Sequence, residues 1–224
     1  MFEFLAEAMD FVRHPRKRSF ARNELDRKLL PHLPFRNGFF VEAGANDGCS
    51  QSNTLYFEKY RGWRGLLIEP IPELAARCRV NRPRCLVENC ALVPADFLGD
   101  SIEMRFCNLM SLVKGAMKSE AGDLAHVQLG CEVQKVSTYE VKVPARTLSS
   151  IFDAHGITQI DLLSLDVEGF ELQALRGLDL RRHRPGHLLV EARFRQEIVA
   201  LLKPSYKVVA ELSEHDVLYK ALPA

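Results

Sequence analysis

The sequence predicts an α/β fold built on an open, mostly parallel sheet with helices on both faces. From Phe39 onward, short apolar runs alternate with segments of helical pattern, as expected for parallel strands joined by crossover helices. The runs are almost continuously hydrophobic, which suits strands that are covered on both faces. After Pro204, two strand-like runs are separated only by residues 213–215, so the chain is expected to close with an antiparallel hairpin.

Each element has its own local signals. Before the hairpin, strands are expected within residues 38–44, 64–70, 84–89, 159–166 and 187–193. Helices are expected within residues 52–60, 70–81, 147–156 and 171–177. Pro72 suits a first helical turn, and Thr147 is a good N-cap. Gly156 and Gly177 are typical stops.

Two parts of the chain depart from this alternation. Residues 1–37 precede the first strand and are interpreted as an N-terminal helical segment, with the main domain running over residues 38–224. Within that domain, residues 99–146 contain two runs that alternate like strands, around a less regular stretch at 108–134. Long connections of this kind are usually functional or mobile, so residues 99–146 are interpreted as an insertion carrying a substrate-facing lid.

Composition excludes several classes of protein. The chain has 224 residues, 47% of them hydrophobic and 26% charged, which fits one globular domain. A net charge of +1 gives no overall attraction to nucleic acid, so no nucleic-acid partner is expected. The six cysteines form no C-x-x-C pair and are expected to be free thiols in a reducing, cytoplasmic setting. No apolar run reaches the roughly 20 residues needed to cross a bilayer.

The first 18 residues have a pattern of their own. Phe2, Leu5, Met9 and Val12 recur at helical spacing and are followed by a basic cluster at 13–18. One interpretation is a helix that packs on the domain and ends in a solvated basic tail. The other is a helix that contacts a membrane surface or a partner.

The turn after the first strand reads Glu42-Ala-Gly44-Ala-Asn46-Asp-Gly48. Glycines at 44 and 48 let a ligand approach the backbone, and asparagine enters left-handed conformations readily. In an open parallel sheet this loop is the usual floor of the ligand crevice. A dinucleotide fingerprint would need glycines at Asn46 and Cys49, so that class of site is not indicated. Carboxylates around the turn suit a ligand with positive charge.

The second strand ends in Glu69, before Pro70. A carboxylate at this place can accept hydrogen bonds from both hydroxyls of a ribose. The crevice therefore suits a molecule that joins a nucleoside to a cationic group, as S-adenosylmethionine does. The alternative for Glu69 is a solvated residue before a proline turn.

The fourth strand leads into Asp166 and Glu168, followed by Gly169. Acids at the mouth of the crevice can position an acceptor hydroxyl and take its proton. The alternative is that one of the two caps the helix that begins near Glu171.

Together these motifs resemble the FkbM family of S-adenosylmethionine-dependent methyltransferases, and the form of residues 52–70 looks closest to its Star-like branch. The resemblance runs over residues 38–222. It implies the class I methyltransferase (Rossmann-like) sheet of seven strands with the last antiparallel, and O-methylation of hydroxyls on sugars, polyketides and other natural products. It also implies catalytic roles for Asp166 and Glu168 beside the transferred methyl, and cofactor contacts from Glu42, Gly44, Asn46, Gly48, Asn53, Glu69, Asn89 and Ala91.

The expected function is therefore O-methyl transfer from S-adenosylmethionine to a small-molecule or glycan acceptor, with specificity in residues 108–135. Two alternatives stay open: a non-catalytic binding or trafficking module, and an RNA methyltransferase that uses the basic N-terminus. A divalent metal is a further open question. Catechol-type methyltransferases hold magnesium at the ends of strands four and five, where this chain has Asp166 and Glu191.

Overall fold

The large sheet determines where everything else lies. The computed structural model describes residues 19–223. Seven strands lie in the order β10-β11-β9-β8-β1-β2-β3, and all neighbours are parallel except at β11, which is antiparallel to β9 and β10. The parallel sheet with an antiparallel C-terminal hairpin is thus confirmed. The strands are β1 (Phe39–Ala43), β2 (Arg64–Ile68), β3 (Leu86–Glu88), β8 (Leu162–Leu165), β9 (His187–Glu191), β10 (Tyr206–Glu211) and β11 (Asp216–Ala221).

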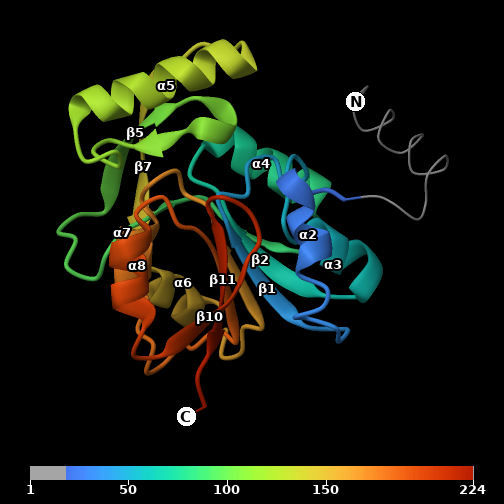
Figure 1. The fold of residues 1–224 in the computed structure, drawn as a ribbon. Helices are drawn as coiled ribbons and strands as arrows, with labels where there is room; N and C mark the ends of the chain where they lie inside the picture. The colour runs from blue at the N-terminus through green and yellow to red at the C-terminus, as the bar shows by residue number, and fades with distance from the viewer. Residues whose placement is uncertain (1–18, 224) are drawn as a thin grey trace.

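Helices cover both faces of this sheet (Figure 1). One face packs against α2 (Leu25–Lys28), α3 (Leu55–Arg61) and α4 (Pro72–Asn81). The other packs against α6 (Leu148–Ala154), α7 (Glu171–Arg176) and α8 (Arg195–Leu202). Four of these match the helices expected from the sequence, whereas α2 and α8 were not singled out.

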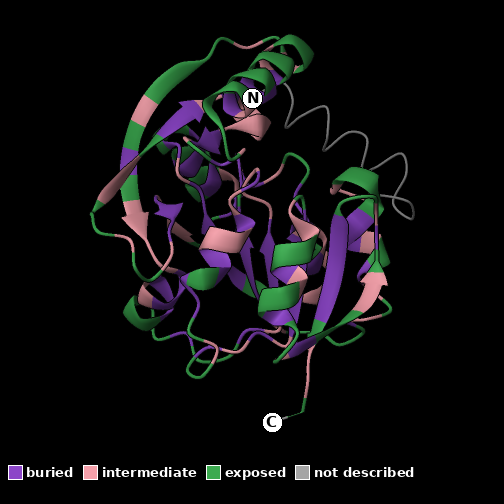
Figure 2. Cartoon of the chain, turned by 60° about the vertical axis from the view of Figure 1, so that its left-hand side comes forward, coloured by how far each residue is buried: buried purple, intermediate pink, exposed green. Residues whose placement is uncertain are grey.

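The core consists of two apolar layers, one on each face of the sheet. Neighbouring residues of a strand point to opposite faces, so Phe40 packs in one layer and Val41 in the other. Leu162 and Leu163 of β8 divide in the same way. Figure 2 shows the consequence, with central strands buried and the outer surfaces of most helices exposed. Burial on both faces explains the continuous hydrophobic runs.

A second sheet of four strands lies at the carboxyl end of the large one (Figure 1). Its order is β4-β7-β5-β6, and β5 pairs antiparallel with both β6 and β7. The two alternating runs predicted within residues 99–146 are its longest strands. The elements of this region are β4 (Ala91–Leu92), β5 (Ser101–Phe106), the 3-10 turn η2 (Asn108–Met110), β6 (Leu112–Val113), α5 (Glu120–Gln134) and β7 (Tyr139–Arg146).

The expectation of an irregular stretch at 108–134 was wrong, because half of it forms the 15-residue helix α5. Ser119 caps this helix by accepting a hydrogen bond from the Gly122 amide at 3.0 Å. Gly130 permits close packing, since a Cβ there would lie 2.6 Å from the Cys107 Sγ. Internal glycines and the buried polar residues Asp123 and His126 obscure the helical pattern in the sequence.

The described part of the N-terminal segment is only partly helical. Residues 22–28 form the short turn η1 (Arg22–Glu24) and α2, and Leu25, Leu29 and Leu33 are buried against the sheet. The patterns at residues 1–18, with the proposed membrane or partner contact, lie outside the described residues. Within residues 19–223, no helix has the length and apolar character needed to cross a membrane.

Candidate active site

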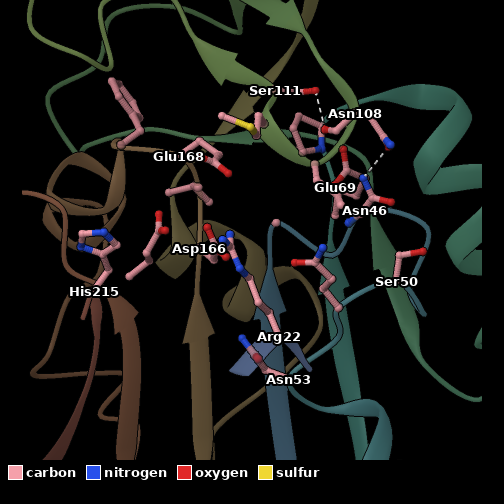
Figure 3. Close-up of a pocket in the computed structure, with 18 of the residues that line it drawn as sticks. Arg22, Asn46, Ser50, Asn53, Glu69, Asn108, Ser111, Asp166, Glu168 and His215 are labelled. Atoms are coloured by element: carbon pink, nitrogen blue, oxygen red, sulfur yellow. Dashed lines mark hydrogen bonds between the residues drawn. The ribbon is translucent and has the colours of Figure 1, made fainter. Parts of the chain in front are cut away.

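A cavity of about 620 Å³ opens at the carboxyl ends of β1, β2 and β8. Its roof is formed by η2 and β6, so the second sheet faces the first across it (Figure 3). The size is within the range of small-molecule sites. Seven of the ten predicted site residues line this cavity: Gly44, Asn46, Asn53, Glu69, Ala91, Asp166 and Glu168.

The turn after β1 requires glycine at its first position. Gly44 has φ of 82°, and a Cβ added there would lie 1.8 Å from the carbonyl oxygen of Asp166. The ends of β1 and β8 therefore meet with no space for a side chain between them. Asn46 has φ of 50°, which bears out its expected left-handed conformation.

Glu69 and Asn46 form one polar wall of the cavity. The Glu69 carboxylate accepts hydrogen bonds from the backbone amides of Asn46, at 2.8 Å, and Ile71, at 2.9 Å. The Asn46 side-chain amide donates to Asn108 Oδ1 of η2 at 3.0 Å (Figure 3). Glu69 is only 5% exposed, and burial raises its pKa to about 8. The solvated alternative for Glu69 is therefore wrong.

Three predicted cofactor positions, Glu42, Gly48 and Asn89, are not among the lining residues. The Glu42 carboxylate lies beneath the loop, where it accepts hydrogen bonds from the Asn53 amide at 2.7 Å and the Ser52 hydroxyl at 2.8 Å. The Asn89 amide donates to the carbonyl oxygens of residues 69 and 70. A Cβ at Gly48 would lie 3.0 Å from the Arg82 Cγ. In this structure these three residues support the loops that form the cavity.

Arg82 supports the same loop, and no motif in the sequence indicates this role. Its guanidinium is buried, forms ion pairs with Glu42 and Glu58, and donates to the Gly48 carbonyl oxygen at 2.9 Å. We expect Arg82→Lys to lower the free energy of unfolding by about 2 kcal/mol, because lysine keeps the charge but not the forked set of donors. Urea unfolding measures this. Arg84→Lys, at an exposed position, is the control, and an equal loss in both variants would contradict the prediction.

The other wall of the cavity is acidic. Asp166 follows β8 directly, and Glu168 has φ of 53°, an uncommon conformation that brings its carboxylate to the cavity. Glu168 Oε2 lies 3.2 Å from His126 Nε2 of α5 and 3.3 Å from Arg193 Nη2. Together these contacts join the strand end, the lid and the segment after β9.

Neither Asp166 nor Glu168 caps α7, so the capping alternative was wrong. The N-cap of α7 is Phe170, which makes no side-chain capping bond. Instead, Oε1 of Glu171, the first residue of the helix, accepts hydrogen bonds from the amides of Val167, at 3.1 Å, and Gly169, at 2.9 Å. The two predicted catalytic carboxylates are thus left free to face the cavity.

Burial and mutual repulsion raise the pKa values of the carboxyl groups in this acidic wall. Burial, followed by the charges of Glu191 and Glu168, raises the pKa of Asp166 well above its ordinary value. Burial also raises the pKa of Glu171 to about 7 and, with the charge of Glu168, raises that of Glu191. The site therefore favours a positively charged ligand.

Several lining residues were not named individually by sequence reasoning. Asn108, Met110, Ser111 and Gln134 belong to the segment 108–135 that was expected to contact the acceptor, whereas Arg22 of η1 and His215 of the β10–β11 turn were not expected there (Figure 3). Of these two, His215 had a usable signal. Asp216 pairs with Glu191 at the carboxyl end of β9, so an antiparallel hairpin brings its turn to the cavity edge. The other positions depend on tertiary packing.

This strand order, with a cavity at the carboxyl ends of the central strands, is that of an open α/β sheet with a ligand crevice. The model of the methyltransferase FkbM domain matches residues 42–218, and the chain belongs to that family. The expected family and cofactor are thereby confirmed.

Comparison with solved structures gave matches with TM-scores below 0.5, three of which are the following methyltransferases. One, from Geobacter sulfurreducens, is 14% identical with a TM-score of 0.47, and the match covers 97% of this chain and 87% of that chain. The precorrin-6y C5,15-methyltransferase of Geobacter metallireducens is 11% identical, with coverage of 91% and 90% and a TM-score of 0.47. A methyltransferase from Thiobacillus denitrificans in complex with S-adenosyl-L-homocysteine is 11% identical, with coverage of 89% and 70% and a TM-score of 0.41. Comparison with curated proteins gave no significant match by sequence.

Proposed function

We propose that this methyltransferase acts on a hydroxyl group of a sugar or secondary metabolite. The observation that carries the proposal is the arrangement of carboxylates around one cavity, with Glu69 and Asn46 on one wall and Asp166 and Glu168 on the other. The first pair suits a nucleoside, and the second suits a reacting hydroxyl.

The cofactor half of the cavity fits S-adenosylmethionine. Glu69 would accept the ribose hydroxyls, and the backbone of Gly44, which lines the cavity, would lie beside the cofactor. Ile68, Ala91 and Leu92 supply an apolar wall for the adenine. The bound cofactor supplies an electrophilic methyl group, and its positive charge suits the acidic wall.

Glu168 is the proposed proton acceptor. Its carboxylate lines the cavity, and His126 Nε2 at 3.2 Å offers the proton an onward acceptor. Asp166 would orient the hydroxyl beside it. As the oxygen gains the methyl group, the hydroxyl proton passes to Glu168, so charge does not build up on the oxygen.

The acceptor half has a mixed lining, which favours a molecule with both hydroxyl groups and apolar faces. Met104, Met110 and Phe170 are apolar, whereas Asn108, Ser111 and Gln134 carry hydrogen-bonding groups. Sugars and hydroxylated natural products combine these two features. All six residues except Phe170 belong to the inserted segment, which supports the lid as the region that selects the acceptor.

The direct test has two parts. Calorimetry of the full chain with S-adenosylhomocysteine should show one site with a dissociation constant in the micromolar range. Transfer of labelled methyl to a panel of sugars and hydroxylated metabolites should then give an alkali-stable, ether-linked product. Binding without transfer to any hydroxyl, but with transfer to an amine or RNA, would reject the proposal. Absence of cofactor binding would favour the non-catalytic module.

The raised pKa of Glu69 leads to a pH prediction. Ionised Glu69 accepts the ribose hydroxyls better than the neutral acid does. Because burial raises the pKa of Glu69 to about 8, the fraction of molecules with an ionised Glu69 grows as pH rises through 8. Affinity for S-adenosylhomocysteine should increase about tenfold from pH 7 to pH 9. Calorimetry at both values measures this.

The matched control for that prediction is Glu69→Gln, which keeps the shape but does not titrate. The affinity of Glu69→Gln for S-adenosylhomocysteine should be weaker than that of the wild type at pH 9, and it should be the same at pH 7 and pH 9. A wild-type affinity that falls as pH rises, or a slope that persists in Glu69→Gln, would contradict the assignment.

A further inference from the structure

We propose that Asp166, Glu171 and Glu191 form a binding site for one hard divalent cation, such as Mg²⁺, Mn²⁺ or Ca²⁺. The three side chains come from the end of β8, the start of α7 and the end of β9. Glu171 was not among the residues that the sequence indicated, and it is the residue that completes the site.

The spacing suits a single ion. One carboxylate oxygen from each residue lies within 4.8 Å of those from the other two. Oxygens on opposite sides of one ion are about 4.2 Å apart for Mg²⁺ and about 4.6 to 5.2 Å apart for Ca²⁺, twice the respective bond lengths. Three oxygens at this limit of separation lie at most about 2.8 Å from a common centre, so they reach the bond length of Ca²⁺ with movements of a few tenths of an ångström and that of Mg²⁺ with movements of about 0.7 Å.

Two buried oxygens indicate that the cluster is built for a ligand. Glu171 is 0% exposed, and its Oε1 is held by the amides of Val167 and Gly169, while its Oε2 has no hydrogen-bond partner among the described residues. Oε2 of Glu191 also lacks one. A buried carboxylate oxygen without a partner is costly, and a cation would satisfy both.

Charge near the cluster supports the same conclusion. The largest charge effects on Asp166 come from four further acids: Glu191, Glu168, Glu171 and Asp216. Arg193 Nη2 lies 3.8 Å from Glu191 Oε2 and 3.3 Å from Glu168 Oε2, and Arg22 also lines the cavity. Two arginines do not balance five acids, and an all-oxygen site selects hard cations over zinc or copper.

The position also suggests a use, which rests on the proposed function. Asp166 and Glu191 line the cavity together with Glu168, so a cation there would lie beside the acceptor hydroxyl. A bound cation lowers the pKa of a coordinated hydroxyl and orients it. Glu168 is outside the proposed ligand set and stays available to accept the proton.

The test is a titration of the full chain with Mn²⁺, followed by electron paramagnetic resonance of the free ion, in the absence of any cofactor. We expect one saturable site with a dissociation constant below about 0.1 mM. Glu171→Gln and Glu191→Gln should each weaken binding at least tenfold. Glu214→Gln, an exposed acid at the rim of the same cavity, is the matched control and should change the affinity less than threefold.

Two outcomes would overturn the proposed cation site. One is the absence of saturable Mn²⁺ binding, and the other is equal Mn²⁺ affinity in Glu171→Gln, Glu191→Gln and Glu214→Gln. Circular dichroism identifies a variant that fails to fold, and Asp166→Asn then takes its place. Calorimetry with S-adenosylhomocysteine separates the two proposals: cofactor binding without Mn²⁺ binding rejects only the cation site, and the reverse rejects only the proposed function.

Discussion

We expect Gly44→Ala to abolish measurable binding of S-adenosylhomocysteine and to lower the free energy of unfolding by about 4 kcal/mol. Alanine would have to adopt φ of 82°, and its Cβ would lie 1.8 Å from the Asp166 carbonyl oxygen. This atom belongs to the backbone, so relief requires β1 and β8 to separate. Separation would move Asp166 and Glu69 away from their places on the cavity walls. Calorimetry and urea unfolding measure the two effects.

Gly156→Ala is the matched control for this prediction. Gly156 also has a positive φ, of 61°, but an added Cβ there meets no atom within 4 Å. It ends α6, away from the cavity. The control should lose about 1 kcal/mol of stability, the cost of the left-handed conformation, and keep its affinity. If Gly44→Ala lost no more than the control, close contact between the strand ends would not be the reason for the glycine.

We expect Glu168→Gln to lower kcat about 100- to 10,000-fold, the usual contribution of a general base. Glutamine preserves the length and the contact with Arg193 but cannot accept the proton. Affinity for S-adenosylhomocysteine should change less than about threefold, because Glu69 and Asn46 lie on the opposite wall. Single-turnover methylation of an identified acceptor measures the chemical step separately from binding.

The control for Glu168→Gln is Glu73→Gln, an exposed acid in the first turn of α4 that does not line the cavity. It should retain kcat within about twofold. An unchanged kcat in Glu168→Gln would show that Glu168 is not the general base. A raised KM for the acceptor with an unchanged kcat would instead show that Glu168 binds the acceptor.

The residues at the strand ends, where we propose that the cofactor binds, were largely predictable because local chemistry specifies them. Gly44 and Asn46 occupy left-handed conformations that few residue types tolerate, and Glu69 and Asp166 follow apolar runs that can only be buried strands. Parallel strands bring such ends to one edge of the sheet. The sequence therefore predicted that these strand ends lie together, and seven of the ten residues that it indicated line the cavity.

A lid within residues 99–146 was predicted, but its individual contacts were not predictable, because they join residues that are distant in the sequence. Asn108 meets Asn46 across 62 positions, and the helical pattern of α5 is obscured by Gly130, whose role depends on Cys107. Glu171 was missed for a related reason. At the start of a short helix it looked like an ordinary first-turn acid, and only the approach of β9 turns it into part of an acidic cluster.

The hydrogen bond between Asn46 and Asn108 also has an evolutionary consequence. It joins the loop after β1 to a continuous segment between β4 and β7. The proposed role of this segment in selecting the acceptor implies that its exchange between relatives that retain the asparagine pair transfers the choice of acceptor and leaves cofactor binding in place.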